Sequence, residues 1–292
     1  MSTPKLSFLA TLRQSGRQAL QWRLLLLWVL VLLVPTAILA LPFWMSLSAT
    51  LDHSLYAAQW ARQLDALMLS DVMSRLMEHS AALGHSSLIA MVLTLLFSPF
   101  LTGMVITTAR AQTVPGFATL IQGGVREYGR LLRMLVWALV PLGLAIALGS
   151  VGTQWAETSG DKAILESAAQ LHRLLALGVM GVLLWLAHAS VDAGRAQFAL
   201  FSKRRSAVKA WWRGLQTLRH NLLPMLGGYL VVTVVGLLLV IGLTALRLAM
   251  PQLGAFWMVM GLLLAQVVIA ILVWMRIARL LTLIAQSRNQ TI

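Results

Sequence analysis

Six stretches of the sequence contain no aspartate, glutamate, lysine or arginine, and each of them is long. They cover residues 24–51, 79–109, 134–156, 174–191, 220–246 and 248–275. A helix needs about 20 mostly apolar residues to cross the hydrocarbon core of a bilayer. Only 11% of the 292 residues are charged, whereas soluble domains carry roughly a quarter. The chain is therefore predicted to be a polytopic membrane protein.

These stretches predict helices rather than the strands of a barrel. The segments "LLLLWVLVLLV" at 24–34 and "LVVTVVGLLLVIGL" at 230–243 are apolar on every side. Barrel strands alternate in polarity, whereas a helix satisfies its own backbone and tolerates an apolar surface all round. We therefore predict an all-α fold with one transmembrane domain over residues 1–292. Its six spans are placed near 24–45, 87–109, 131–152, 174–193, 222–246 and 255–275.

The segment 46–86, between the first two spans, is too long for a simple connection. Within it Tyr56, Trp60, Leu64 and Leu67 recur at steps of three and four residues. This spacing predicts an amphipathic helix with one apolar stripe. We expect it to lie on the outer leaflet or to cover the bundle.

Basic residues are distributed unevenly about the predicted spans. If both termini lie on one side, that side holds 18 of the 23 lysines and arginines but only two acids, Glu127 and Asp192. Its formal charge is near +16 (18 minus 2), and that of the other side is near −2 (5 minus 7). Lysine and arginine are retained on the cytoplasmic side during insertion. Both termini are therefore predicted to be cytoplasmic.

Short motifs recur around the spans. Those that precede outward spans are "ATLRQSGR" at 10–17, "ATLIQGGV" at 118–125 and, more loosely, "AVKAWWRG" at 207–214. A small residue followed by arginine ends each inward span, at Arg110, Arg195 and Arg279. The motifs predict three units, each with a basic interfacial helix and a helical hairpin of two spans. The alternative is the ordinary basic bias of inner helix ends, without a repeat.

The motif "HASVDAGRAQ" at 188–197 places ionisable side chains at the end of the fourth span. His188 and Asp192 are four residues apart and share a helix face, a spacing that suits two metal ligands or a carboxylate that orients an imidazole. Two ligands are too few for a zinc site. The favoured interpretation is structural, with Asp192 paired to an arginine and His188 hydrogen-bonded inside the bundle.

A second set of polar residues lies deeper in the spans. Pro99, in "FSPFLTG" at 97–103, removes a backbone donor near mid-membrane. Freed carbonyls at such a break coordinate cations in some transporters, but more often the break is a simple kink. Gln266 is the most central polar residue of the last span, and Ser98 and Thr233 are its predicted hydrogen-bond partners. Together with His188, these residues form a hypothetical polar path.

The segment "SKRRSAVKAWWRGLQTLRHN" at 202–221 combines basic residues with two tryptophans. Such a mixture also occurs in nucleic-acid binding. Its place directly before a span favours anionic lipid instead, because tryptophans populate the headgroup region and basic residues are attracted to anionic headgroups. The predicted contacts are Lys203, Arg204, Arg205, Lys209, Trp211, Trp212 and Arg213.

No sequence motif indicates a reaction. The chain has no cysteine, and it lacks a P-loop, a dinucleotide fingerprint, an HExxH helix and a G-x-S-x-G elbow. Acids are too scarce for a paired-carboxylate site. We therefore predict no cofactor, no catalytic or metal-binding residue and no nucleic-acid partner.

Four segments carry a resemblance to a known family. They are "SPFLTG" at 98–103, "ARAQ" at 109–112, "DAGRAQFAL" at 192–200 and "KRRSAVKAWWRGL" at 203–215. In these the chain resembles a family of bacterial six-span inner-membrane proteins, similar to stand-alone versions of the membrane domain of some glycerophosphodiester phosphodiesterases. The resemblance implies the six-span topology and a location in the bacterial inner membrane. It carries over no active-site residue.

Two functions are predicted from these features. The first is a non-enzymatic inner-membrane protein that binds anionic lipid at its basic cytoplasmic rim and organises or moves envelope components, with other membrane proteins as further partners. The alternative is a secondary transporter or permease subunit that uses the polar path. A polar path requires Ser98, His188, Thr233 and Gln266 to converge on one route through the bundle.

Overall fold

The computed structural model describes residues 7–51, 70, 73–74, 77, 80–160, 166–250 and 254–290. Within these residues the fold is all-α, with eight helices and no strand. The helices are α1 (Phe8–Ala19), α2 (Trp22–Leu51), α5 (Ser80–Arg110), α6 (Phe117–Gly160), α7 (Glu166–Leu200), α8 (Ala207–His220), α9 (Leu222–Ala249) and α10 (Ala255–Gln290). The helix predicted around Tyr56 and Trp60 lies outside the described residues.

The six predicted spans are confirmed. Helices α2, α5, α6, α7, α9 and α10 are each long and apolar enough to cross a membrane. By helix length and hydropathy, the chain is a multi-pass membrane protein. Several helices extend well past the predicted span, and α6 begins at Phe117 rather than near 131. Residues such as Arg126 and Arg130 are good helix formers, so the helix does not end where the apolar stretch ends.

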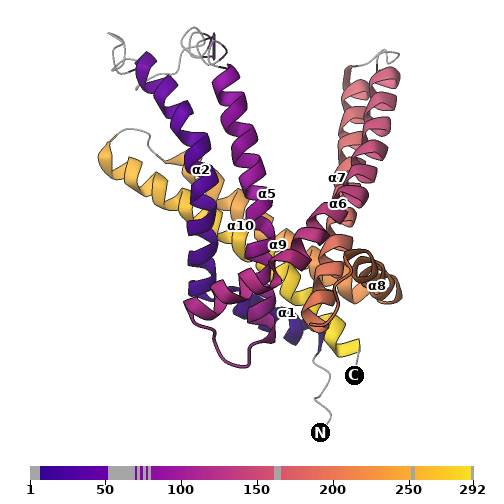
Figure 1. Ribbon diagram of the computed structural model, residues 1–292. Coiled ribbons are helices and arrows are strands. Elements are labelled where there is room, and N and C mark those ends of the chain that lie inside the picture. The colour runs from indigo at the N-terminus through magenta and orange to yellow at the C-terminus, as the bar shows by residue number, and fades with distance from the viewer. Residues whose placement is uncertain are drawn as a thin grey trace.

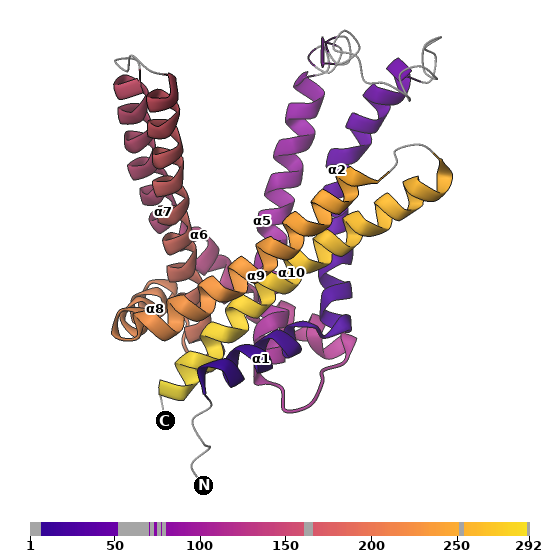
Figure 2. The ribbon, with the colours of Figure 1, turned by 180° about the vertical axis from the view of Figure 1, so that it is seen from behind.

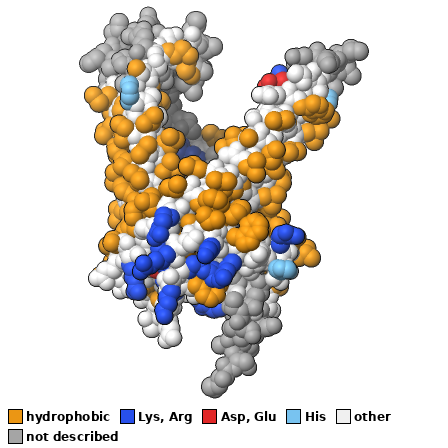
Figure 3. Space-filling model, turned by 45° about the vertical axis from the view of Figure 1, so that its right-hand side comes forward, with side chains coloured by type: hydrophobic (Ala, Val, Ile, Leu, Met, Phe, Trp, Pro, Cys, Tyr) orange, Lys and Arg blue, Asp and Glu red, His pale blue; other side chains and the backbone are white. Residues whose placement is uncertain are grey.

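The spans pair as three helical hairpins, α2 with α5, α6 with α7 and α9 with α10. Figures 1 and 2 show the hairpins converging at one end of the molecule, where α1 lies and α10 ends, and splaying apart toward the other end. Lysine and arginine side chains gather over the convergent end, and hydrophobic side chains cover the arms (Figure 3). We call the convergent end the basic end.

A short amphipathic helical segment precedes each hairpin: α1, residues 117–130 of α6, and α8. Each segment packs against the second span of the preceding unit. Thus α8 packs on α7, the start of α6 packs on α5, and α1 packs on α10 of the last unit. The three units therefore form a closed ring at the basic end, in agreement with the predicted repeat.

Small residues allow two of these contacts. A Cβ atom at Gly214 of α8 would lie 2.6 Å from the backbone carbon of Ala193 in α7. A Cβ atom at Gly124 of α6 would lie 2.7 Å from the Phe100 ring in α5. Only glycine lets the helices approach this closely, as is common where membrane helices cross. The ring of units therefore depends on glycines within the recurring motifs.

The buried core lies at the basic end, where the second spans α5, α7 and α10 contact one another. Met104, Phe198 and Leu283 are fully buried there. Toward the splayed end the spans expose large apolar side chains, such as Leu139 and Leu262. In lipid this exposure is favourable, because hydrocarbon is as apolar as leucine. The fold thus buries its charged side chains in the convergent core.

Candidate functional site

A buried cluster of charged and polar side chains lies where the second spans meet. Asp192 of α7 is only 3% exposed. Its carboxylate accepts a 2.7 Å hydrogen bond from Arg195 Nη1 and a 3.0 Å bond from the hydroxyl of Tyr229 on α9. These two donors satisfy a carboxylate that would otherwise be costly to bury. The favoured interpretation of Asp192, pairing to an arginine, agrees with these contacts.

Two arginines of α10 extend this cluster to the first hairpin. Arg276 donates a 2.8 Å hydrogen bond to Ser98 Oγ on α5, and its guanidinium lies 5.4 Å from the ring centroid of Trp28 on α2. Arg279 lies 5.0 Å from the centroid of the Tyr229 ring. All three hairpins therefore contribute side chains. The cluster joins the hairpins through cation–π contacts and charge-assisted hydrogen bonds.

His188 lies one turn before Asp192 and interacts with its charge. It makes no hydrogen bond to any residue that the structure describes. Among those residues, no group of three or more histidine, aspartate or glutamate side chains is placed to hold a metal ion. The contacts of Asp192 are thus those of a structural ion pair.

The structure does not bring the hypothetical polar path together. Gln266 is exposed on the surface of α10, and its predicted partners bond to other groups. The Thr233 hydroxyl donates a 2.7 Å bond to the Tyr229 carbonyl of its own helix, and Ser98 accepts from Arg276. Pro99 lies inside α5, which continues past it to Arg110. These placements give no support to the permease alternative.

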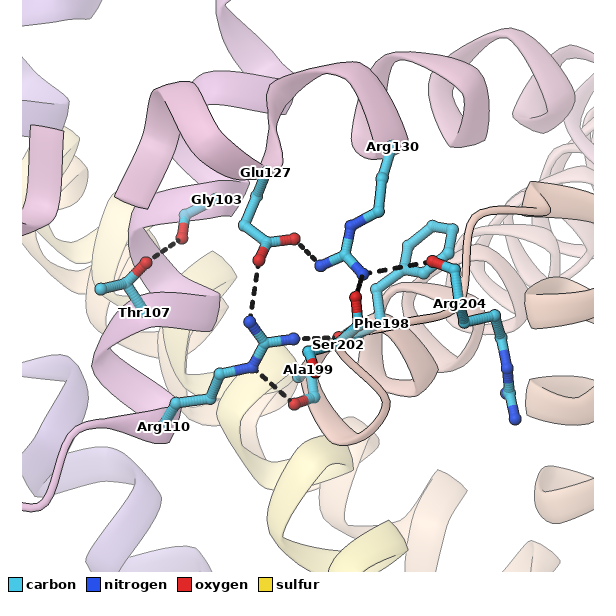
Figure 4. Close-up of polar contacts among 9 residues, drawn as sticks. All are labelled: Gly103, Thr107, Arg110, Glu127, Arg130, Phe198, Ala199, Ser202 and Arg204. Atoms are coloured by element: carbon cyan, nitrogen blue, oxygen red, sulfur yellow. Dashed lines mark hydrogen bonds and ion pairs between the residues drawn. The ribbon is translucent and has the colours of Figure 1, made fainter. Parts of the chain in front are cut away.

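The second inner acid, Glu127 on α6, is the centre of another network (Figure 4). Glu127 is 3% exposed and pairs with Arg110 at 2.8 Å and with Arg130. Arg110 also donates to the carbonyls of Phe198 and Ala199 at the end of α7. The last carbonyls of a helix have no partner within it, so these donors satisfy them.

Arg130 extends the network to the loop after α7. Its guanidinium donates to the carbonyls of Ser202 and Arg204 and to Glu127. These bonds hold the loop that carries Lys203, Arg204 and Arg205. Glu127 thus anchors the basic loop after α7. It does not neutralise the basic residues of that loop, because its two oxygens pair with Arg110 and Arg130.

Helix α8 presents three different faces. Ala207, Ala210, Gly214 and Leu218 are buried against the bundle. Val208 and Trp212 form an apolar face and are 46% and 55% exposed. A third face exposes Lys209, Arg213, Gln216 and His220. An amphipathic helix of this kind suits the boundary between hydrocarbon and headgroups.

The structure places the two tryptophans of α8 differently. Trp212 is exposed, whereas Trp211 is half-buried and donates a 3.2 Å hydrogen bond to Ser190 Oγ on α7. The Trp211 ring also makes an edge contact with Trp137, with centroids 5.7 Å apart. Lipid contact by both tryptophans stays a prediction. Lys203, Arg205, Lys209 and Arg213 are exposed, and Arg204 is half-buried.

Three members of the buried cluster were missed by the sequence reasoning as partners of Asp192, namely Tyr229, Arg276 and Arg279. One signal was available for Arg276. In "DAGR" and "RIAR", which end the second and third units, Asp192 and Arg276 occupy the same position. The repeat therefore predicts that both side chains face the centre of the ring.

Comparison with known proteins places the chain in no family: no family model, no curated protein and no solved structure matches it. The resemblance noted in the motifs therefore stays a prediction. The geometry defines a multi-pass membrane protein with a buried charge cluster and a basic surface at one end.

Proposed function

We propose that this protein is a non-enzymatic protein of the bacterial inner membrane that binds anionic lipid through its basic end. The basic end lies in the cytoplasm, and lipid binding serves to organise or move envelope components, including other membrane proteins. The resemblance noted in the sequence motifs fits this setting. The positive-inside rule supports the orientation, because 18 of the 23 basic residues belong to segments on that side.

One observation carries this proposal: the exposed basic residues have no acids to neutralise them. Glu127 and Asp192 are the only acids in residues 79–156 and 167–292. Glu127 is paired with Arg110 and Arg130, and Asp192 with Arg195. Lys203, Arg205 and Lys209 therefore remain as excess positive charge, which anionic headgroups attract by about 1 kcal/mol for each residue near the membrane surface.

Helix α8 supports lipid rather than a soluble acidic partner. Its apolar face, with Val208 and Trp212, adjoins the basic face with Lys209 and Arg213. A soluble partner would require the apolar face to be covered by protein, whereas a bilayer meets both faces at once. The geometry is that of a helix lying along the membrane surface.

The lipid preference is tested on full-length protein in mixed micelles. Tryptophan quenching by brominated phosphatidylglycerol is compared with quenching by brominated phosphatidylcholine. We expect the wild type to prefer the anionic lipid, and Lys203→Gln with Arg205→Gln to weaken that preference several-fold. The matched control, Arg173→Gln with Arg247→Gln, removes the same charge from the opposite end and leaves the preference unchanged. Equal quenching by the two lipids in the wild type would reject the proposal.

The orientation is tested by single-cysteine labelling, since the chain has no cysteine of its own. In intact spheroplasts, an impermeant maleimide should label Ser167→Cys, near the start of α7, but not Gln112→Cys, in the exposed loop between α5 and α6. Permeabilisation should expose Gln112→Cys. Labelling of Gln112→Cys from outside would show that the basic end faces away from the cytoplasm.

A further inference from the structure

The end of α7 with the loop after it, the helix α8 and the end of α10 line an open pocket of about 440 Å³ at the basic end. Its lining includes Arg204, Arg213, Thr217 and His220. Pockets that hold small ligands span about 300–1,000 Å³, so this one has room for a headgroup-sized molecule. The buried charge cluster uses none of these side chains.

Arg204 is fixed in position within this pocket. Its Nη1 donates a 3.0 Å hydrogen bond to Gln197 Oε1, and its guanidinium lies 4.4 Å from the Phe201 ring centroid. Gln197 in turn donates to Thr217 Oγ1 at 3.4 Å. A guanidinium has five N–H donors. The other donors of Arg204 have no partner among the residues that the structure describes, and they remain available to a ligand.

The charges of the pocket are not balanced. Partial burial and the positive charge of Arg213 both lower the pKa of Arg204, although an arginine stays protonated at neutral pH. Among the described residues, none that lines the pocket carries a carboxylate, and Glu127 and Asp192 are paired elsewhere. Two guanidinium groups from different elements thus meet at one cavity, and an anion between them would relieve their repulsion.

We propose that this pocket binds a phosphate group, which belongs either to a lipid headgroup or to a soluble phosphate compound. A phosphodiester offers two charged acceptor oxygens and a phosphate monoester offers three, and either set can bridge Arg204 and Arg213. Bidentate recognition of phosphate is a characteristic use of arginine. Of this inference, only the assignment of the phosphate to a lipid headgroup rests on the proposed function. The apolar face of α8, which lies beside the pocket, supports that assignment.

The test is isothermal titration calorimetry on the full-length protein in a neutral detergent. The three probes are inorganic phosphate, dihexanoyl phosphatidylglycerol and dihexanoylglycerol, which lacks the phosphate. We expect binding of both phosphate-bearing probes and none of dihexanoylglycerol. Tighter binding of the phosphatidylglycerol would assign the pocket to a lipid headgroup, and tighter binding of inorganic phosphate would assign it to a soluble phosphate.

Two variants locate the binding. Arg204→Gln and Arg213→Gln should each weaken phosphate binding about tenfold or more, as expected for the loss of a charge-assisted hydrogen bond. The side chain of Arg213 makes no hydrogen bond to a described residue. We therefore expect Arg213→Gln to fold even if Arg204→Gln does not. Arg219→Gln is the matched control on the same helix outside the pocket, and it should change binding less than twofold.

Binding that is unchanged in Arg213→Gln, or absent in the wild type, would overturn the proposed pocket whatever the lipid preference of the basic end. Conversely, phosphate binding that depends on Arg204, together with equal quenching by the two brominated lipids, would overturn the proposed function and retain the pocket as a site for a soluble phosphate. The two proposals therefore fail in different experiments.

Discussion

The indole N–H of Trp274 donates a 3.0 Å hydrogen bond to the carbonyl of Gly16, a residue 258 positions earlier in the chain. This bond joins α10 of the last unit to α1 of the first. The other two junctions join neighbouring units, through Gly124 beside Phe100 and Gly214 beside Ala193. The long-range bond therefore belongs to the α1–α10 junction that closes the ring.

Replacement of Trp274 by phenylalanine should loosen this closure. Phenylalanine keeps an aromatic ring, though a smaller one, and loses the hydrogen bond to Gly16, which alone costs about 0.5–1.5 kcal/mol. The measurement is reversible unfolding in SDS, followed by circular dichroism. Trp44→Phe, at an exposed position of α2, should unfold like the wild type. Equal stability of the Trp274 and Trp44 variants would show that the bond does not hold the ring.

The contact between α8 and α7 can be tested at Gly214. In Gly214→Ala the new Cβ atom meets the backbone of Ala193 and Gly194 at 2.6 Å, and backbone cannot move aside cheaply. We expect a loss of about 1–3 kcal/mol in the free energy of unfolding. Gly227→Ala is the control, because nothing lies within 4 Å of its Cβ. A neutral Gly214→Ala would contradict the close packing of these helices.

The buried ion pair predicts a strong asymmetry between two substitutions. Asp192→Asn leaves Arg195 buried without its counter-charge and should destabilise the protein by about 3–5 kcal/mol. Tyr229→Phe removes one donor but keeps the pair, so it should cost only about 1–3 kcal/mol. Both losses are measured by unfolding in SDS. The double variant Asp192→Asn with Arg195→Gln should cost less than the two single changes added together, and strict additivity would argue against the pairing.

The Glu127 network should control the order of the loop after α7. In Glu127→Gln, Arg110 and Arg130 lose their shared carboxylate and hold the carbonyls of Phe198 and Ser202 less firmly. Amide hydrogen exchange in residues 198–206 should then accelerate, with a global loss of about 1–3 kcal/mol. The exposed Glu157→Gln gives the matched control. Unchanged exchange in this loop would show that Glu127 does not anchor it.

The spans and the three units were predictable because their signals are local. Uncharged stretches predicted six helices, and the recurring motifs "ATLRQSGR", "ATLIQGGV" and, more loosely, "AVKAWWRG" marked the three amphipathic segments. The sequence did not predict which unit each amphipathic segment packs against. Contacts such as that of Gly16 with Trp274 depend on tertiary packing. Helix ends also differed, because the α6 helix continues through charged residues.

Side-chain directions within the spans were harder to predict. Gln266 lies at the middle of an apolar stretch, but a helix that is apolar all round gives no periodic signal for which face is buried. Trp211 and Trp212 are neighbours in sequence and point in different directions from α8, one to Ser190 and one outward. Such placements follow from the neighbouring helices rather than from residue type.

Each amphipathic segment docks on the preceding hairpin, so the junctions between units are head-to-tail. Heterologous contacts of this kind grow into filaments unless the rotation between units returns to the start. Here three units suffice, and all three docking surfaces are occupied within one polypeptide. These three docking surfaces are therefore closed to a second copy of the chain.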